Sequence, residues 1–374
     1  MLNFFPFYIG LSYFLVLFFY LSLRGKIRFH YLYHNPATRW FSLFSIYSLG
    51  TSLIHQNIYG MAVSFLYFLF ILYFAYYEKN APPDLFDKLV NICMLASAFI
   101  FIYVVLEHLE IVAEWDYSFI ASGIDKNHSN RVEATFFNPN YFALMLEFFI
   151  AMGLYKLFTS QTTWKRVIYA GLIVGNTLAT FYTGNRTSPI VIVAAVLVFF
   201  YVLSYRKTAL ALTSILGIGL VVFAVSGHYP RIDSIAWALQ DRLEIWETGL
   251  RGIKDNWIFG QGPYTYMQIY DLYGGKFTYH AHSIYIDTLL NYGIVGSSML
   301  LVTAGKYLRW MVQMHRYPQL KAKAALVWSM LAIFLVHGIS DLAIYWFQTA
   351  FVFLTLILLV PSLVKAEETK KEAL

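Results

Sequence analysis

Charged residues are scarce in this sequence. Asp, Glu, Lys and Arg make up 13% of its 374 residues, about half the share of roughly 25% found in an ordinary soluble domain. Apolar residues reach 59% and aromatic residues 19%. This composition excludes a soluble enzyme, a disordered chain and a nucleic-acid-binding protein, and it indicates an all-α polytopic membrane protein. The net charge of +6 is then expected to follow membrane topology.

Cysteine is nearly absent from the chain. Cys93 is the single one, which excludes a disulfide framework and a cysteine-based metal site. Internal repeats and low-complexity segments are missing as well. We therefore expect residues 1–374 to form a single integral membrane domain.

Long apolar stretches take up most of the chain. A helix that crosses a bilayer needs about 20 mainly apolar residues. Eleven stretches approach this length, so we expect about 11 transmembrane helices, with 10–12 possible. The first stretch is not expected to be a signal peptide, because it has no basic leader and no clear small-residue cleavage site. The stretches are 4–23, 40–54, 58–77, 89–109, 141–158, 167–183, 187–204, 208–226, 283–304, 324–339 and 344–364.

Lysine and arginine predict the orientation, because they concentrate on the cytoplasmic side of membrane proteins. With the N-terminus outside, the six cytoplasmic segments carry 18 of the 27 basic residues, and only 8 lie outside. We therefore expect a multi-pass membrane protein with its N-terminus outside, its C-terminus inside and a cytoplasmic tail at 365–374. The eight outer residues are Lys126, Arg131, Arg186, Arg231, Arg242, Arg251, Lys254 and Lys276.

Two of the expected outer loops are long, at 110–140 and 227–282. Loops of this length are usually functional. The second loop carries several arginines, His280 and His282, and we expect it to bear the active site. Within it, apolar residues at helical spacing over 235–253 predict a short amphipathic helix lying along the outer membrane face.

The outer arginines are candidates for binding phosphate. Arg186 lies in a tight predicted hairpin beside Gly184, where a guanidinium suits a lipid phosphate. The alternative is an interfacial arginine that only reaches into the headgroup region. Arg242 and Arg251 are nine residues apart, about 180° around a helix. They could therefore bind different groups, or only one of the two could face the site.

The two histidines at the start of the ninth stretch suit proton transfer, since the unperturbed pKa of histidine is nearest to neutral. His282 lies closer to the helix start, where backbone N–H groups favour anionic ligands. A metal site formed by His280 and His282 is a weaker alternative, because no HExxH, DxD or cysteine cluster accompanies them. An interfacial histidine without chemistry is the third interpretation.

Two carboxylates, Glu147 and Asp287, fall inside apolar stretches. Intramembrane acids are functional candidates by default and usually face the interior of the helix bundle. Each could pair with an arginine, hold a sugar hydroxyl or relay protons, and a buried structural pair is an equal alternative. Asp341 lies near the outer end of the tenth stretch, and His337 receives no predicted role.

A spaced motif gives the clearest family signal. His282 and Ser283 are followed, after nine residues, by Gly293 and then by Gly296. This spacing resembles that of the O-antigen ligase and Wzy polymerase superfamily, the lipid-linked glycan ligases and polymerases of bacterial envelopes.

Further elements in the same order strengthen the resemblance. They are the Arg242 and Trp246 pair, the Phe-Gly-x-Gly element at 259–262, the small-residue–Arg–Thr turn at Arg186, and the Asn-Pro-Asn entry that ends at Asn140. The specific part of the resemblance covers about 130–300.

The resemblance implies a GT-C-like, metal-independent glycosyltransferase that needs no cofactor. Its donor would be an undecaprenyl-diphosphate-linked oligosaccharide. Its acceptor would be a glycan or glycolipid hydroxyl at the outer face of the bacterial cytoplasmic membrane. Arg186 and Arg242 would hold the departing diphosphate, and His282 would position or deprotonate the acceptor. The lipid bilayer and other polysaccharide-assembly proteins are the expected partners. The candidate substrate-binding residues are Arg251, His280, Asn140, Tyr285, Glu147 and Asp287.

Three functions stay open at this point. A repeat-unit polymerase for capsule, O-antigen or wall polymer is favoured slightly, because the Phe, Tyr, Ile, Leu and Lys bias is typical of an AT-rich genome. A ligase of the same superfamily, which uses a separate acceptor, is the first alternative. A polysaccharide transporter or flippase is the second, although such proteins often show paired repeats and midplane sites.

Overall fold

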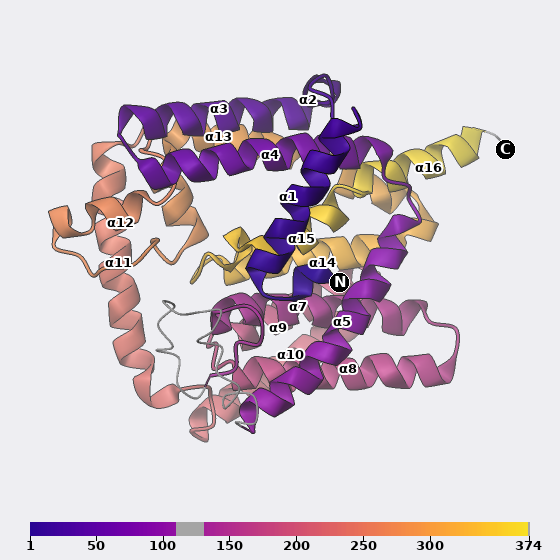
Figure 1. The fold of residues 1–374 in the computed structure, drawn as a ribbon. Coiled ribbons are helices and arrows are strands. Elements are labelled where there is room, and N and C mark those ends of the chain that lie inside the picture. Colours follow the sequence, from indigo (N-terminus) through magenta and orange to yellow (C-terminus); the bar gives the residue numbers. More distant parts are fainter. Residues whose placement is uncertain (110–130, 373–374) are drawn as a thin grey trace.

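The computed structural model describes residues 1–109 and 131–372, and the described residues form helices and connecting loops without a strand (Figure 1). Each of the eleven apolar stretches falls on a helix, and the last is divided between two. The helices are α1 (Phe7–Leu23), α2 (Tyr31–His34), α3 (Pro36–Ile54), α4 (Ile58–Asn80), α5 (Leu85–His108), α7 (Pro139–Thr159), α8 (Thr163–Tyr182), α9 (Ser188–Val202), α10 (Arg206–Val225), α11 (Ile235–Asp255), α12 (Thr265–Ile269), α13 (Ile284–Gln313), α14 (Lys321–His337), α15 (Phe347–Ile357) and α16 (Val360–Glu372).

Seven helical segments within the described residues are long and apolar enough to cross a membrane. The other predicted spans correspond to α1, α3, α8 and α9, of which α1 and α9 are shorter apolar helices. The predicted all-α polytopic membrane fold is confirmed. Of the first outer loop, 110–140, only the part from residue 131 is described, so Lys126 lies outside the described residues. The seven segments are Ile58–Asn80, Leu85–His108, Pro139–Thr159, Arg206–Val225, Ile284–Arg316, Pro318–His337 and Phe347–Glu372.

Asn-Pro pairs lie at the starts of α3, at Asn35, and of α7, at Asn138. The side chain of Asn138 accepts a hydrogen bond from the Asn140 amide at 2.8 Å, and Pro139 occupies the first helical position of α7. An asparagine cap satisfies a backbone donor that has no partner within the helix, and proline fits there because it lacks an N–H group. This cap places Asn140 in the first turn of α7.

Helix α7 forms the centre of the bundle. It contacts α8, α9 and α14, and its residues from Phe142 to Tyr155 are buried without interruption. By contrast, Ala209 is the only buried residue of α10. Since a helix that is apolar on all sides is either buried or faces lipid, α7 suits the core and α10 the lipid boundary.

Helix α11 lies across one end of the bundle. Figure 1 shows α3, α4 and α8 running across the view, whereas α11 runs from top to bottom at their left ends. The amphipathic helix predicted over 235–253 is confirmed as Ile235–Asp255. Gly249 and Gly252 allow α11 to approach α13, because a Cβ on either would lie 2.8 Å from the side chain of Ile286 or Leu290. Its position along a membrane surface stays a prediction.

The orientation can be tested by labelling. With Cys93 replaced by alanine, we expect Leu272→Cys, whose parent side chain is 78% exposed in the 227–282 loop, to react with an impermeant thiol reagent in intact cells. Phe29→Cys is the matched control, because Phe29 is 67% exposed in a segment predicted to be cytoplasmic. Labelling of Phe29→Cys alone in intact cells would reverse the orientation.

Candidate functional site

His282 precedes α13 and faces the loop that follows α14. Its Nδ1 lies 3.2 Å from Oδ1 of Asp341, and the two side chains are 20% and 3% exposed. Asp341 Oδ1 also accepts a hydrogen bond from the Leu342 amide at 2.8 Å, and its Oδ2 accepts one from Asn140 Nδ2 at 2.6 Å. The sequence did not assign Asp341 a role, and the structure pairs it with the predicted acceptor-activating histidine.

The contact with Asp341 determines which ring nitrogen of His282 can accept a proton. Burial alone would raise the pKa of the Asp341 carboxyl, but the adjoining His282 outweighs it and holds that pKa well below its ordinary value. An ionised carboxylate can only accept hydrogen bonds, so His282 Nδ1 carries the proton. In the neutral imidazole Nε2 then keeps its lone pair and can accept a proton from another molecule.

Asn140 connects Asp341 to an arginine. Its Oδ1 accepts hydrogen bonds from Arg131 Nη2 at 2.8 Å and from Asn185 Nδ2 at 3.0 Å. Because both of these groups are donors, the amide must point its Nδ2 toward Asp341. A continuous hydrogen-bonded chain therefore runs from Arg131 through Asn140 and Asp341 to His282.

Three further arginines, Arg186, Arg231 and Arg242, lie beside this chain. Arg186 Nη2 donates to the backbone oxygen of Arg231 at 3.2 Å. A Cβ on Gly184 would lie 3.1 Å from Arg231 Cδ and 3.3 Å from Arg131 Nε, so glycine is needed where these side chains pass. The charge of Arg242, on α11, acts on both Arg186 and Asp341.

Two of the arginines, Arg131 and Arg186, are buried and lie close to further positive charges, and both effects lower their pKa. Burial, together with the charge of Arg231, lowers the pKa of Arg131 to about 10. Burial and the charges of Arg231 and Arg242 also lower the pKa of Arg186, whose Nε is buried without a hydrogen-bond partner. Cations that repel one another and retain an unused donor are suited to a ligand with several negative charges.

A residue of α13, Asp287, binds the backbone of the segment that carries His280 and His282. Asp287 accepts hydrogen bonds from the Ala281 amide at 2.9 Å and from Asn291 Nδ2 at 2.7 Å. His280 Nδ1 accepts a hydrogen bond from the His282 amide at 3.2 Å. Burial and the neighbouring His282 lower the pKa of His280 to about 4, so His280 is neutral at pH 7.

The spaced glycines lie where residues 257–262 pack against α13. At Gly293 α13 is interrupted, with φ 59° and ψ −168°. Four backbone hydrogen bonds close the gap. Asn291 O accepts from Gln261 N at 3.1 Å and from Gly262 N at 2.7 Å, while Ile294 N donates to Trp257 O at 2.9 Å and Val295 N to Ile258 O at 3.1 Å. A broken helix inside a membrane needs such partners for its freed backbone groups. Gly260, from the 259–262 element, and Gly293, from α13, therefore lie on opposite sides of the same backbone contact.

Gly260 gives a test of this contact. It has φ +65°, and a Cβ there would lie 2.4 Å from the Asn291 oxygen, whereas Gly274 has φ +64° and open space. Both alanine variants carry the left-handed backbone penalty of about 1–2 kcal/mol, and Gly260→Ala adds overpacking of about 1–3 kcal/mol. We expect Gly260→Ala to unfold at a clearly lower temperature than Gly274→Ala in detergent. Equal midpoints would contradict the close approach.

One group of potential metal ligands lies within the described residues. His280, His282 and Asp341 offer ligand atoms that lie within 4.8 Å of one another. His282 and Asp341 already bond to each other, however, and Arg242 acts electrostatically on both His280 and Asp341. A divalent cation would be repelled by the neighbouring arginines, so the charge distribution favours an anion.

Other predicted site residues lie apart from His282 or have protein partners. Glu147 is fully buried on α7, where both of its oxygens face His337 Nδ1, at 2.9 and 3.1 Å. Arg251, on α11, lies in an exposed ion pair with Glu247 at 2.6 Å. The Tyr285 hydroxyl donates to Leu335 O at 2.9 Å. Substrate binding by these residues stays a prediction.

Residues 172–301 match the family model described as O-antigen ligase. The matched segment includes Arg186, Arg242, His282 and both glycine motifs, and it confirms the resemblance found in the sequence. No curated protein matches the chain. The match supports a membrane ligase or polymerase of polysaccharide assembly that acts on lipid-linked glycans.

Proposed function

From the O-antigen ligase match over residues 172–301, we propose that the protein is a metal-independent glycosyltransferase and most specifically a polysaccharide repeat-unit polymerase. Its donor is a glycan carried on undecaprenyl diphosphate, and its acceptor is a sugar hydroxyl at the outer face of the cytoplasmic membrane. The observation that carries the proposal is the placement of an arginine cluster beside His282 and Asp341.

The arginines receive the diphosphate. As the bond from the anomeric carbon to the diphosphate oxygen breaks, negative charge builds on that oxygen. Arg186 and Arg242 stabilise this charge before and during departure, and Arg131 and Arg231 extend the positive field. Preorganised cations do not need to reorganise at the moment of reaction, so they take the part that a metal ion plays in many other glycosyltransferases.

His282 acts as the general base for the acceptor hydroxyl. The acceptor oxygen forms the new bond to the anomeric carbon while its proton passes to Nε2 of His282. Asp341 receives the Nδ1 hydrogen bond and stabilises the imidazolium that forms. Asn140 holds Asp341 in place, since its Nδ2 donates to Asp341 Oδ2 at 2.6 Å. The proton lost by the acceptor and the diphosphate lost by the donor are thereby both accounted for.

The product pattern tests the polymerase assignment. Purified protein is incubated with its lipid-diphosphate glycan alone and then with a separate glycolipid acceptor, and the products are separated on a gel. A ladder from the donor alone is the expected result. A single transfer that requires the separate acceptor would identify a ligase instead.

A further inference from the structure

A second polar site lies at the other end of α7. A cavity of about 410 Å³ opens between the ends of α5, α7 and α8, roughly 30 Å from Asn140 at 1.5 Å per helical residue. Its volume falls within the range of small-ligand pockets. All eight residues that line it have polar side chains, although 59% of the chain is apolar.

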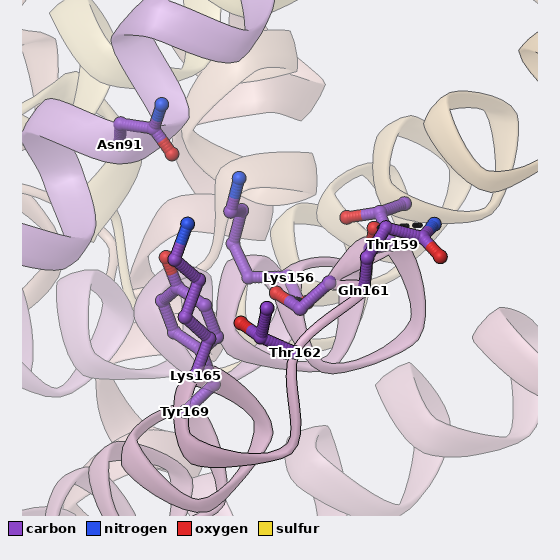
Figure 2. A pocket seen from close by; sticks show the side chains of 8 residues that line it. Asn91, Lys156, Thr159, Gln161, Thr162, Lys165 and Tyr169 are labelled. Carbon is purple, nitrogen blue, oxygen red and sulfur yellow. Dashed lines mark hydrogen bonds between the residues drawn. The ribbon is translucent and has the colours of Figure 1, made fainter.

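Two lysines dominate the charge of the cavity. Lys156 comes from the last turn of α7 and Lys165 from the first turn of α8, and Figure 2 shows both side chains reaching into the same space toward Asn91. Neither lysine forms an ion pair with a described residue. Asp87 is the acid that acts on Lys156, but its Oδ2 lies 2.8 Å from Lys323 Nζ and its Oδ1 accepts the Tyr155 hydroxyl.

Backbone donors add to this positive charge. Helix α8 begins at Thr163, and the side chain of Thr162, its N-cap residue, makes no capping hydrogen bond. The first amides of a helix carry a partial positive charge and have no partner within the helix. The cavity therefore combines two ammonium groups, free helix amides and the side-chain amide of Asn91, which together fit the oxygens of a phosphate.

The surroundings indicate that the phosphate belongs to a lipid. Immediately beyond the cavity, α8 exposes Trp164, Val167 and Ile168, with exposed fractions of 61%, 65% and 49%. Tryptophan at such a boundary, followed by exposed apolar side chains, is typical of the membrane interface. A free phosphate would use only the polar cavity, whereas a phospholipid would also cover this apolar surface.

We propose that this cavity binds the phosphate of an anionic glycerophospholipid from the membrane leaflet at that end of the bundle. Lys156 and Lys165 contact the phosphate oxygens, the free amides of α8 add hydrogen bonds, and the acyl chains lie along α8. This site is independent of glycan transfer at His282, so its test uses lipid binding alone.

Binding is measured by native mass spectrometry of the purified full chain in detergent, titrated with dioleoyl phosphatidylglycerol. Each basic residue near a lipid surface contributes about fivefold in affinity, so Lys156→Gln combined with Lys165→Gln should lower affinity by about 25-fold. The matched control combines Lys88→Gln with Lys207→Gln, which removes the same charge outside the cavity; Lys88 is paired with Asp84 at 2.6 Å. Thermal unfolding in lipid-free detergent verifies that both variants fold.

The expected result is one preferentially bound phosphatidylglycerol in the wild type and the control, and its loss in the cavity variant. An equal loss in the control would show only general attraction to positive charge and would overturn the proposal. Equal binding of dioleoyl phosphatidylcholine would overturn it as well. Displacement of the lipid by inorganic phosphate at low millimolar concentration would assign the cavity to free phosphate.

Discussion

Replacing His282 with alanine is expected to lower the rate of glycan transfer by about 10²–10⁴-fold, the usual cost of losing a general base. The reason is the Asp341 contact at 3.2 Å, which keeps the proton on Nδ1 and leaves Nε2 as the acceptor. Donor binding should largely survive, because the arginine cluster is untouched. The measurement is the initial rate with purified protein and saturating donor, beside a separate donor-binding titration.

Two further variants distinguish base catalysis from positioning. His282→Gln can form hydrogen bonds but cannot take a proton, so it should be about as slow as alanine. Turnover close to that of the wild type across neutral pH would remove the base role and leave positioning. His280→Ala should cost less, because Nδ1 of His280 accepts the His282 amide and therefore supports the segment.

Replacing Arg242 with alanine is expected to lower transfer by at least 10²–10³-fold, about the cost of removing one preorganised donor from a developing negative charge. Arg242 forms no ion pair with a described residue, and its charge acts on Arg186 and Asp341. The alanine variant should therefore fold normally. Arg242→Lys should recover only part of the rate, because an ammonium cannot bind a phosphate through two parallel hydrogen bonds.

Arg186→Ala is expected to have a similar effect on rate, with some loss of stability. Its Nη2 donates to the Arg231 oxygen at 3.2 Å and also to the Ser234 hydroxyl, so thermal unfolding must be followed beside activity. Lys254→Ala is the matched control, because Lys254 is an exposed basic residue on the same helix as Arg242. Full activity of Arg186→Ala or Arg242→Ala would remove that arginine from the site.

Hydropathy alone was sufficient to locate the long apolar helices. A run of apolar residues has to be buried or face lipid, so each of the eleven stretches falls on a helix, and the last is divided between α15 and α16. Helix α11 was equally predictable, because its apolar residues recur at helical spacing. The interruption at Gly293 was not predicted, since it depends on residues 257–262 folding back against α13.

The site was only partly predictable for the same reason. Arg186, Arg242 and His282 were recognised from the motif and from their unusual placement in outer segments. Arg131 and Arg231 occur among the outer basic residues, but their positions beside Gly184 and Arg186 depend on how distant segments pack together. Asp341 lies 59 positions from His282, so sequence spacing could not reveal their contact.

Glu147 shows why an intramembrane acid supports more than one interpretation. Its burial made a substrate role plausible, yet His337, which had no predicted role, faces both of its oxygens. A buried acid needs a partner whether or not it acts in chemistry. The sequence identifies such an acid but not its partner, because the two lie on different helices, α7 and α14.

The central claim is that diphosphate departure and glycosidic bond formation are one event at the His282 and arginine site. The most direct measurement counts free undecaprenyl diphosphate and new glycosidic bonds from a doubly labelled donor, with purified protein in the presence of a chelator. We predict one diphosphate released for each bond formed, with both products lost together in His282→Ala and Arg242→Ala. Movement of intact lipid-linked glycan across a reconstituted bilayer, with neither product formed, would contradict the account and identify a transporter.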